Sequence, residues 1–248
     1  MKKILLVSGD SFTDKEWTSD FYPDEDFDWP KWPELLGKKY NMQVVNLGRS
    51  GAGNEYIYHS ILDYLTDTPK HMVGAVIAGW SQCHRKDFQV NGKWTNTRVD
   101  PHGDIYSFFN KTLRHYLSLQ ILCERYNLPF YQFQMIDPFR DYVTGLKFSD
   151  TDIAKGLATP TDKLFSMMGD GDSVKMQLYK NIMWWDRVMN TKNFYGWPIA
   201  KDLNGKIMSE NLTPDLRVSE LDTHPNELGQ QKIMEILYDW LGPRLSKE

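Results

Sequence analysis

The sequence holds few of the residues and patterns that mark specialised classes of protein. Its two cysteines, Cys83 and Cys123, are too few in 248 residues for a disulfide-bonded framework. No apolar run approaches the roughly 18 residues that a membrane-spanning helix requires. The segment Met1 to Val7 also falls short of the roughly 7–15 apolar residues of a secretory signal. We therefore expect a cytoplasmic protein without membrane association, whose two thiols are reduced and buried.

Positive charge is not in excess either. The chain has 29 Lys and Arg against 33 Asp and Glu, so it lacks the basic surface typical of nucleic-acid-binding domains. The six histidines show no spacing typical of metal ligands, and no glycine-rich phosphate-binding loop occurs. We expect neither nucleic acid nor a metal nor another cofactor as a partner, and the sequence leaves the oligomeric state open.

What the sequence does contain is an alternation of short apolar runs and amphipathic stretches. Four apolar runs are typical of buried parallel strands: 3–8, 43–47, 74–80 and 130–136. Apolar residues at helical spacing predict four helices: 32–40, 55–65, 107–126 and 225–241. The alternation predicts an α/β fold, a three-layer α/β/α sandwich with helices on both faces of a mostly parallel sheet of four or five strands.

Smaller signals refine this prediction. Asn91-Gly92 is typical of the two-residue turn of a β-hairpin, and Asn54 is placed to cap the helix over 55–65. The long stretch 137–220 has little regular pattern apart from a helix expected near 174–189. We interpret 137–220 as an inserted loop and helix subregion, a lid or a set of binding loops, within a single domain spanning 1–248.

The candidate chemistry lies near the two ends of the chain. Ser11 directly follows the first predicted strand, at the edge where open α/β sheets bind ligands. His224 precedes the last predicted helix, and Asp222 lies two residues before it. A serine hydroxyl becomes a nucleophile when a neighbouring base takes its proton and a third group orients that base. Taken separately, Ser11 fits a helix N-cap equally well, and Asp222 with His224 fits an N-cap Asp beside a surface His.

Three segments taken together resemble the SGNH/GDSL hydrolases. The family's first, second and last blocks are similar to Gly9-Asp10-Ser11-Phe12, Asn46 to Gly51, and Asp222 to Asn226, in that order. The resemblance covers roughly 1–136 and 220–245. It implies a flavodoxin-like sandwich and ester hydrolysis through an acyl-enzyme. Ser11 would be the nucleophile, His224 the base and Asp222 the acid that orients it, although the family usually spaces these last two as Asp-x-x-His.

The same resemblance implies where the oxyanion is held. The donors would be the backbone amides of Ser11 and Gly51, with Gly48 as the other candidate glycine of the second block. The family's third block, Gly-x-Asn-Asp, contributes an Asn side chain, but here the corresponding run is Gly79-Trp80-Ser81-Gln82. We expect Ser81 or Gln82 to supply the missing donor, whose loss typically costs about 10²–10³ in rate.

The substrate is less clearly indicated. Asp10, Arg49 and Trp80 lie within these blocks and are the candidate substrate-binding residues. Aromatic side chains crowd 14–33 among acidic ones, and we expect most of them to pack the loop and one or two to contact sugar. We expect a small-molecule or glycan ester, with O-acetyl groups on carbohydrate preferred. The alternatives are a catalytically weak or inactive carbohydrate-binding or structural module, which the missing Asn motivates, and a transferase with a sugar hydroxyl as acceptor.

Overall fold

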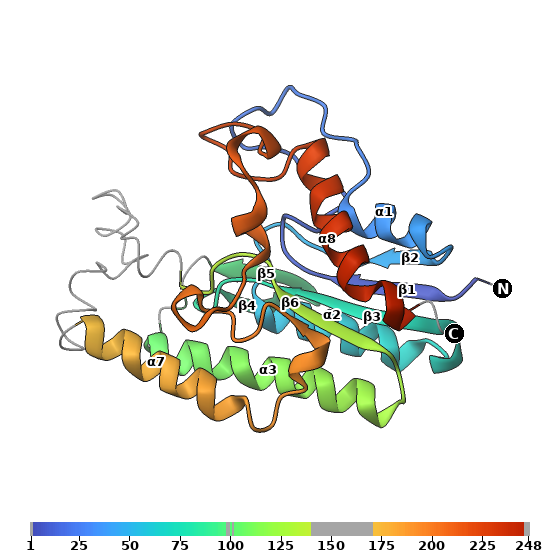
Figure 1. The fold of residues 1–248 in the computed structure, drawn as a ribbon. Coiled ribbons are helices and arrows are strands. Elements are labelled where there is room, and N and C mark those ends of the chain that lie inside the picture. Colours follow the sequence, from blue (N-terminus) through green and yellow to red (C-terminus); the bar gives the residue numbers. More distant parts are fainter. Residues whose placement is uncertain (1, 98–99, 101, 140–170, 246–248) are drawn as a thin grey trace.

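The computed structural model describes residues 2–97, 100, 102–139 and 171–245 (Figure 1). At the centre of these residues is a parallel sheet of five strands in the order β2-β1-β3-β6-β7. The strands are β1 (Ile4–Ser8), β2 (Gln43–Asn46), β3 (Val73–Trp80), β6 (Phe130–Gln134) and β7 (Phe194–Tyr195). The predicted mostly parallel sheet is confirmed, and the four predicted strands agree with β1, β2, β3 and β6 to within two residues at either end.

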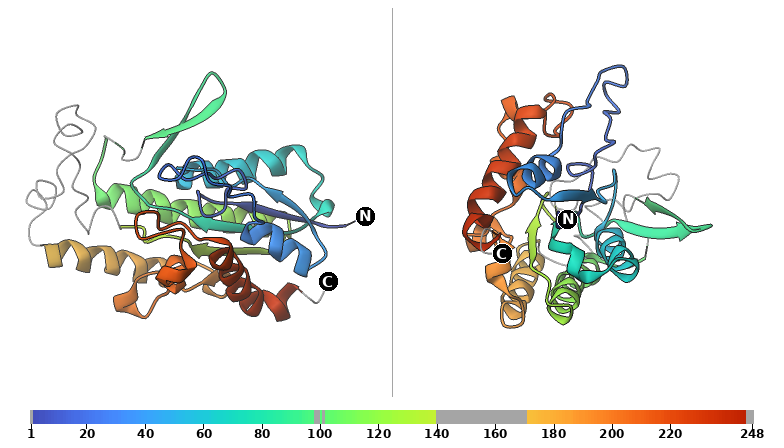
Figure 2. Two further views of the ribbon diagram at one scale, coloured as in Figure 1. Left: turned by 90° about the horizontal axis from the view of Figure 1, so that it is seen from above. Right: turned by 90° about the vertical axis from the view of Figure 1, so that its right-hand side faces the viewer.

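Helices cover both faces of this sheet, as Figure 2 shows in its end-on view. One face carries α1 (Trp32–Lys39) and α8 (Glu227–Leu245), which pack against each other. The other face carries α2 (Asn54–Asp67), α3 (Ile105–Arg125) and α7 (Gly171–Trp185). The three-layer sandwich is therefore confirmed. None of the helices in the described part of the chain is both long and apolar enough to cross a membrane.

Two apolar cores lie on opposite sides of the sheet because side chains alternate along each strand. In β1, Leu6 packs toward α2 and α3, whereas Leu5 and Val7 pack toward α1 and α8. Cys83 and Cys123 belong to the first of these cores as free, buried thiols. Burial raises the pKa of the Cys123 thiol to about 12, so this side chain stays protonated at neutral pH.

Part of 137–220 completes the sandwich and is not an addition to it. Helix α7 packs on α3, and β7 pairs with β6 so that Phe194 faces Gln132 in the register. A two-residue strand leaves almost no period-two signal in a sequence, which explains why β7 was not predicted. Residues 140–170 lie outside the described residues, so a lid there stays a prediction. The short 3-10 helices are Lys70–Met72, Thr191–Asn193, Lys201–Leu203, Met208–Asn211 and Pro214–Leu216.

A β-hairpin projects away from the sandwich, visible in both views of Figure 2. It consists of β4 (Lys86–Val90) and β5 (Lys93–Thr97), paired antiparallel. The two turn residues have positive φ, 51° at Asn91 and 75° at Gly92, as a type I′ turn requires, so the predicted hairpin is confirmed. Asp87 of the hairpin accepts hydrogen bonds from the backbone amides of Gly53 and Tyr56 at 2.9 and 3.0 Å. It thereby caps α2 and fixes the hairpin to the body.

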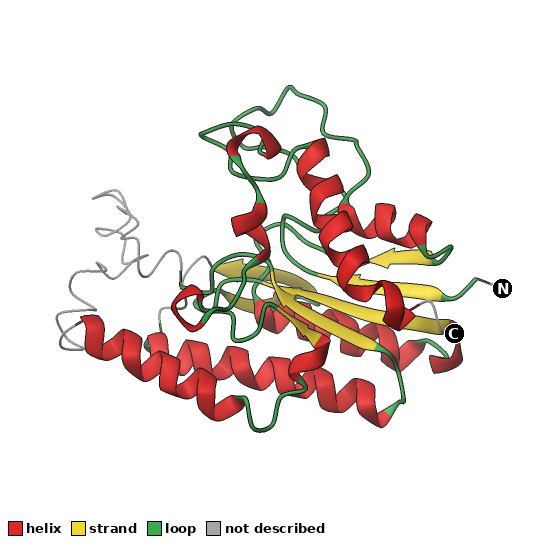
Figure 3. Cartoon of the chain, viewed as in Figure 1, coloured by secondary structure: helices red, strands yellow, loops and turns green. Residues whose placement is uncertain are grey.

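The predicted capping role of Asn54 is wrong, because Gly53 is the N-cap of α2 and Asp87 supplies the acceptor. The Asn54 side chain is buried instead. Its Oδ1 accepts from the Ser81 amide at 2.8 Å, and its Nδ2 donates to Thr112 Oγ1 at 3.0 Å. Asn54 therefore connects the end of β3 to α3. Figure 3 shows the loops that gather at the carboxyl edge of the sheet.

Candidate active site

Ser11 lies in a tight turn directly after β1. The amides of Thr13 and Asp14 donate to the Asp10 carbonyl at 2.8 and 3.0 Å, and the Phe12 amide donates to Asp10 Oδ1 at 3.1 Å. Gly9 permits this turn, since a Cβ there would lie 2.2 Å from Thr13 Oγ1. The turn leaves Ser11 half-buried at the carboxyl edge of the sheet, where the α/β fold places ligand sites.

His224 reaches Ser11 from the other end of the chain. Its Nε2 is 2.8 Å from Ser11 Oγ, and its Nδ1 is 2.6 Å from Asp222 Oδ1. When Nδ1–H donates to the carboxylate, Nε2 carries the lone pair that accepts the hydroxyl proton of Ser11. The structure thus brings together the three residues predicted to act as nucleophile, base and orienting acid, and the Asp-x-His spacing allows the contact between the acid and the base.

The second oxygen of Asp222 has a partner that the sequence did not indicate. The Ser19 hydroxyl donates to Asp222 Oδ2, and both residues are 2% exposed. Burial by itself raises the pKa of Asp222, but the hydrogen bonds from Ser19 and His224 outweigh it and lower the pKa below its ordinary value. Asp222 therefore stays ionised beside the imidazole. No local pattern reveals a contact between residues 203 positions apart.

Two aromatic rings pack against the imidazole of His224. The ring centroid of Trp17 lies 4.6 Å from that of His224, and the centroid of Phe12 lies 5.0 Å from it. Trp17 in turn packs on Phe27 at 5.0 Å, and the buried Lys31 ammonium lies 5.9 Å from the Trp17 ring. Most of the aromatic side chains in the loop after Ser11 therefore pack against other residues of the protein, as predicted.

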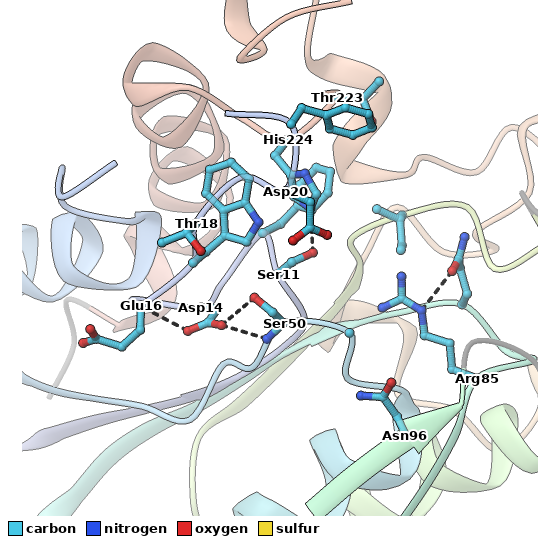
Figure 4. A pocket seen from close by; sticks show the side chains of 16 residues that line it. Ser11, Asp14, Glu16, Thr18, Asp20, Ser50, Arg85, Asn96, Thr223 and His224 are labelled. Carbon is cyan, nitrogen blue, oxygen red and sulfur yellow. Dashed lines mark hydrogen bonds between the residues drawn. The ribbon is translucent and has the colours of Figure 1, made fainter. Parts of the chain in front are cut away.

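Ser11 and His224 open onto a cleft of about 880 Å³ (Figure 4). Asp14, Glu16 and Asp20 line it on the side of the loop that follows β1, while Arg85 and Asn96 lie opposite. The remaining lining residues are Phe12, Trp17, Thr18, Phe21, Ser50, Gly51, Gln82, Ile136 and Thr223. The cleft is thus rich in carboxylates, hydroxyls and amides. Within the described ranges, no three His, Cys, Asp or Glu side chains come together as a metal site requires.

Gly51 lines the cleft together with Ser11, as its predicted role in holding the oxyanion requires. It has φ of 76°, and the Asn96 side chain lies 3.1 Å from where a Cβ would be, so a side chain fits poorly there. Among the described residues, the amides of Ser11 and Gly51 donate to no backbone acceptor outside the regular elements. The Gly48 amide, the other candidate, donates to Asn46 Oδ1 at 2.9 Å and is already used.

Of the two residues that stand in for the family's Asn, Gln82 lines the cleft and Ser81 does not. Arg85 Nε donates to Gln82 Oε1 at 2.9 Å, and Arg85 Nη1 donates to the Ala52 carbonyl at 2.9 Å. The guanidinium therefore holds the amide oxygen, and the NH₂ group, a hydrogen-bond donor, stands at the other end of the branched amide. Ser81 is fully buried and lies outside the lining of the cleft. The structure thus favours Gln82 over Ser81.

The three residues predicted to bind substrate are absent from the lining of the cleft as the structure describes it: Asp10, Arg49 and Trp80. Trp80 is fully buried and its Nε1 donates to Gln132 Oε1 at 3.0 Å. The Arg49 guanidinium lies 5.6 Å from the ring centroid of Tyr56. Asp10 is fully buried within the turn that it stabilises. Complete burial contradicts the expectation for Asp10 and Trp80, because a place in a sequence block does not determine toward which layer a side chain points, and the role of Arg49 stays a prediction.

Comparison with known proteins gives matches among solved structures only, since no protein-family model and no curated protein matches the sequence. The psychrotrophic esterase EstA of a Pseudoalteromonas species, inhibited by monoethylphosphonate, matches with a TM-score of 0.48 at 14% identity, over 99% of this chain and 100% of that one. A catalytic mutant of an acetylxylan esterase from Geobacillus stearothermophilus gives 0.48 at 11%, over 97% and 94%. A member of the lipolytic G-D-S-L family from Veillonella parvula gives 0.44 at 11%, over 99% and 100%. The G-D-S-L family named for the last of these proteins is the one that the three sequence blocks resemble.

The buried Asp10 gives a testable pH dependence of stability. Burial raises its pKa above the ordinary 3.8, against the opposing effects of Arg85 and the Phe12 amide. A carboxyl group with a raised pKa in the folded state destabilises the fold as the pH rises from the ordinary value through the raised one. Asp10→Asn keeps an acceptor for the Phe12 amide and removes this ionisation. We expect its urea midpoint, relative to wild type, to be higher at pH 8 than at pH 4.

Urea unfolding at both pH values, followed by tryptophan fluorescence, checks this expectation. Asp20→Asn changes an exposed carboxylate on the following loop and serves as the matched control. If the urea midpoints of Asp10→Asn and wild type differ by the same amount at both pH values, burial of the Asp10 charge does not destabilise the fold.

Proposed function

We propose that this protein is a serine ester hydrolase in which Ser11 is the nucleophile, His224 the base and Asp222 the acid that orients it. One observation carries the proposal. Two hydrogen bonds of 2.8 and 2.6 Å connect Ser11 Oγ to His224 and His224 to Asp222, and the serine end opens onto a cleft. A surface turn or a helix cap does not require this order of donors and acceptors, whereas activation of a serine nucleophile does.

The proposed reaction has two halves. In the first, Ser11 Oγ attacks the ester carbonyl carbon while His224 Nε2 takes its proton, and the ionised Asp222 stabilises the imidazolium. The tetrahedral intermediate collapses, the bond to the alcohol breaks, and the alcohol leaves with the proton from His224. In the second half, water attacks the acyl-enzyme while His224 takes a proton from it. The carboxylic acid leaves, and Ser11 recovers its proton from His224.

Three donors are proposed to hold the negative oxygen of each tetrahedral intermediate. They are the amides of Ser11 and Gly51 and the side-chain NH₂ of Gln82. Backbone amides need no reorganisation when charge develops on the oxygen, which makes them effective in such a position. The Gln82 side chain approaches this condition because Arg85 fixes its amide oxygen at 2.9 Å. In this proposal Arg85 positions the donor and does not itself contact the oxyanion.

The first experiment compares wild type with Ser11→Ala on p-nitrophenyl acetate. We expect the variant to lose at least about 10³-fold in kcat/KM, since removal of a triad member leaves only the contribution of binding and the oxyanion donors. A fluorophosphonate probe should label wild type on the peptide that contains Ser11, as seen by mass spectrometry, and leave the variant unlabelled. Ser50→Ala, which removes another serine lining the cleft, is the control and should still be labelled.

Two outcomes would contradict the proposal. Hydrolysis that survives in Ser11→Ala would place the nucleophile elsewhere. A wild type that neither turns over nor becomes labelled would favour the alternative, a carbohydrate-binding or structural module, and glycan-array binding that is equal in wild type and Ser11→Ala would then support that alternative.

The choice of oxyanion donor is tested by a pair of neighbouring substitutions. Gln82→Ala should lower kcat by about 10²–10³-fold, the usual cost of one oxyanion donor, with a small change in KM. Ser81→Ala should lower kcat much less, because the Ser81 side chain is fully buried and outside the lining of the cleft. Steady-state kinetics on p-nitrophenyl acetate, with thermal unfolding of both variants, separates these effects. The reverse order of the two effects would assign the donor to Ser81.

We further propose O-acetylated carbohydrate as the substrate. The lining of the cleft supports this: carboxylates, hydroxyls and an amide that bond sugar hydroxyls lie around Ser11, and the Phe21 side chain, 59% exposed, can stack on a sugar ring. A long acyl chain would need a mostly apolar channel in place of these groups.

Acetate release from acetylated oligosaccharides should therefore exceed hydrolysis of p-nitrophenyl palmitate in kcat/KM. Phe21→Ala should raise the KM for the oligosaccharide several-fold and leave the KM for p-nitrophenyl acetate nearly unchanged, since the small ester does not reach the ring. Val90→Ala, an exposed apolar side chain on the hairpin outside the lining of the cleft, is the control. A preference for the palmitate ester would contradict the carbohydrate proposal while leaving ester hydrolysis intact.

A further inference from the structure

We propose that Ser19 is a positioning residue of the active site, whose buried hydroxyl fixes the outer oxygen of Asp222 and thereby the orientation of His224. The inference rests on the proposed function, because it assigns Ser19 a part in activating Ser11. Ser19 does not line the cleft, so it acts through Asp222 and not on the substrate.

The division of hydrogen bonds on the Asp222 carboxylate carries the argument. Oδ1 accepts from His224 twice, from the backbone amide at 3.1 Å and from Nδ1 at 2.6 Å. Oδ2 accepts from the Ser19 hydroxyl. With the Oδ1 contacts alone, the carboxylate would be free to rotate about its Cβ–Cγ bond and to move Oδ1 out of line with the imidazole. The Ser19 hydroxyl holds the second oxygen and so fixes the plane of the group.

Burial makes this contact strong. Asp222 and Ser19 are each 2% exposed, so water does not compete for Oδ2 as it would at a surface. A hydrogen bond to an ionised acceptor is about twice as strong as one between neutral groups. A buried carboxylate oxygen that lost its donor would leave part of the charge uncompensated, at a cost larger than that of an ordinary missing bond.

The loop around Ser19 is built on the same contact. Ser19 Oγ also accepts from the backbone amides of Phe21 and Tyr22 at 3.2 and 3.3 Å, so it shapes the turn that follows. Two residues earlier Trp17 packs on the ring of His224 at 4.6 Å. One loop therefore supplies both the Trp17 ring that packs on His224 and the Ser19 hydroxyl that donates to Asp222.

Other charged groups surround the pair and contribute to any pH dependence. Asp10 at the end of β1 interacts electrostatically with His224. Glu16 and Asp20 lie on the loop that lines the cleft. On the segment before α8, the Arg217 guanidinium donates to the Thr223 carbonyl at 2.8 Å. A substitution at Ser19 leaves all of these groups in place, so a change in the pH profile can be assigned to the bond with Asp222.

The test compares Ser19→Ala with Ser19→Thr and with Ser219→Ala. Ser219 is the matched control, because its hydroxyl oxygen accepts from the Asp222 backbone amide at 2.9 Å but leaves the carboxylate alone. We expect Ser19→Ala to lower kcat on p-nitrophenyl acetate by roughly 10- to 100-fold with little change in KM. Ser19→Thr should recover most of the loss, and Ser219→Ala should stay within a few-fold of wild type.

A pH profile separates positioning from simple support of the fold. In Ser19→Ala the Asp222 carboxylate loses a donor that holds its pKa down, and more of its charge acts on the imidazolium. The acid limb of kcat/KM should therefore move to higher pH in Ser19→Ala and not in Ser219→Ala. ¹³C NMR of the Asp222 carboxyl, assigned with Asp222→Asn, should show titration at higher pH in Ser19→Ala than in wild type.

The outcomes for the two proposals are distinct. If wild type is active and Ser19→Ala keeps its kcat, its acid limb and the Asp222 titration, the role of Ser19 is refuted and ester hydrolysis stands. If wild type is inactive and unlabelled, ester hydrolysis is refuted. In that case an Asp222 carboxyl that titrates at the same pH in Ser19→Ala as in wild type also refutes the contact. Titration at higher pH in Ser19→Ala shows that Ser19 holds the carboxylate of a site with another use.

Discussion

The parallel pairing of β1 with β2 on one side and β3 on the other is the constraint on which the rest of this structure depends. Parallel strands end at the same edge of a sheet, so the loops that follow these three strands must converge. Those loops carry Ser11, Gly51 and Gln82, all of which line one cleft. Every residue of β1 is buried, so packing within the core fixes where the strand ends and thereby where Ser11 lies.

The two hydrogen bonds that connect Ser11 to Asp222 through His224 depend on a second condition, which is the exclusion of water from the Asp222 carboxylate. Asp222 is nearly fully buried, yet it remains ionised because His224 and Ser19 donate to its two oxygens. Trp17 and Phe12 close on the imidazole from the loop after β1. The segment between β1 and α1 thus packs against His224 and bonds to Asp222 as well as carrying Ser11, which gives its aromatic residues a structural role.

The departure from the family's third block has a local explanation in this geometry. At the end of β3 the side chain of Ser81 is fully buried, and the next residue, Gln82, lines the cleft. The Arg85 guanidinium holds the amide oxygen of Gln82 through a hydrogen bond of 2.9 Å. In the proposed function Gln82 takes the place of that Asn, so the missing family residue does not by itself indicate an inactive protein.

The sequence by itself determined the layer architecture, the hairpin at Asn91-Gly92, and the choice of Ser11, His224 and Asp222 as residues of interest. Periodicity, turn chemistry and the resemblance of short blocks are local properties, and each can be recognised within a few residues. Only the tertiary structure decided that Trp80 and Asp10 are buried, that Gln82 and not Ser81 faces the cleft, that β7 completes the sheet, and that Ser19 contacts Asp222. Each of these depends on which face of an element is covered by a distant segment, and no local pattern encodes a contact across some 200 residues.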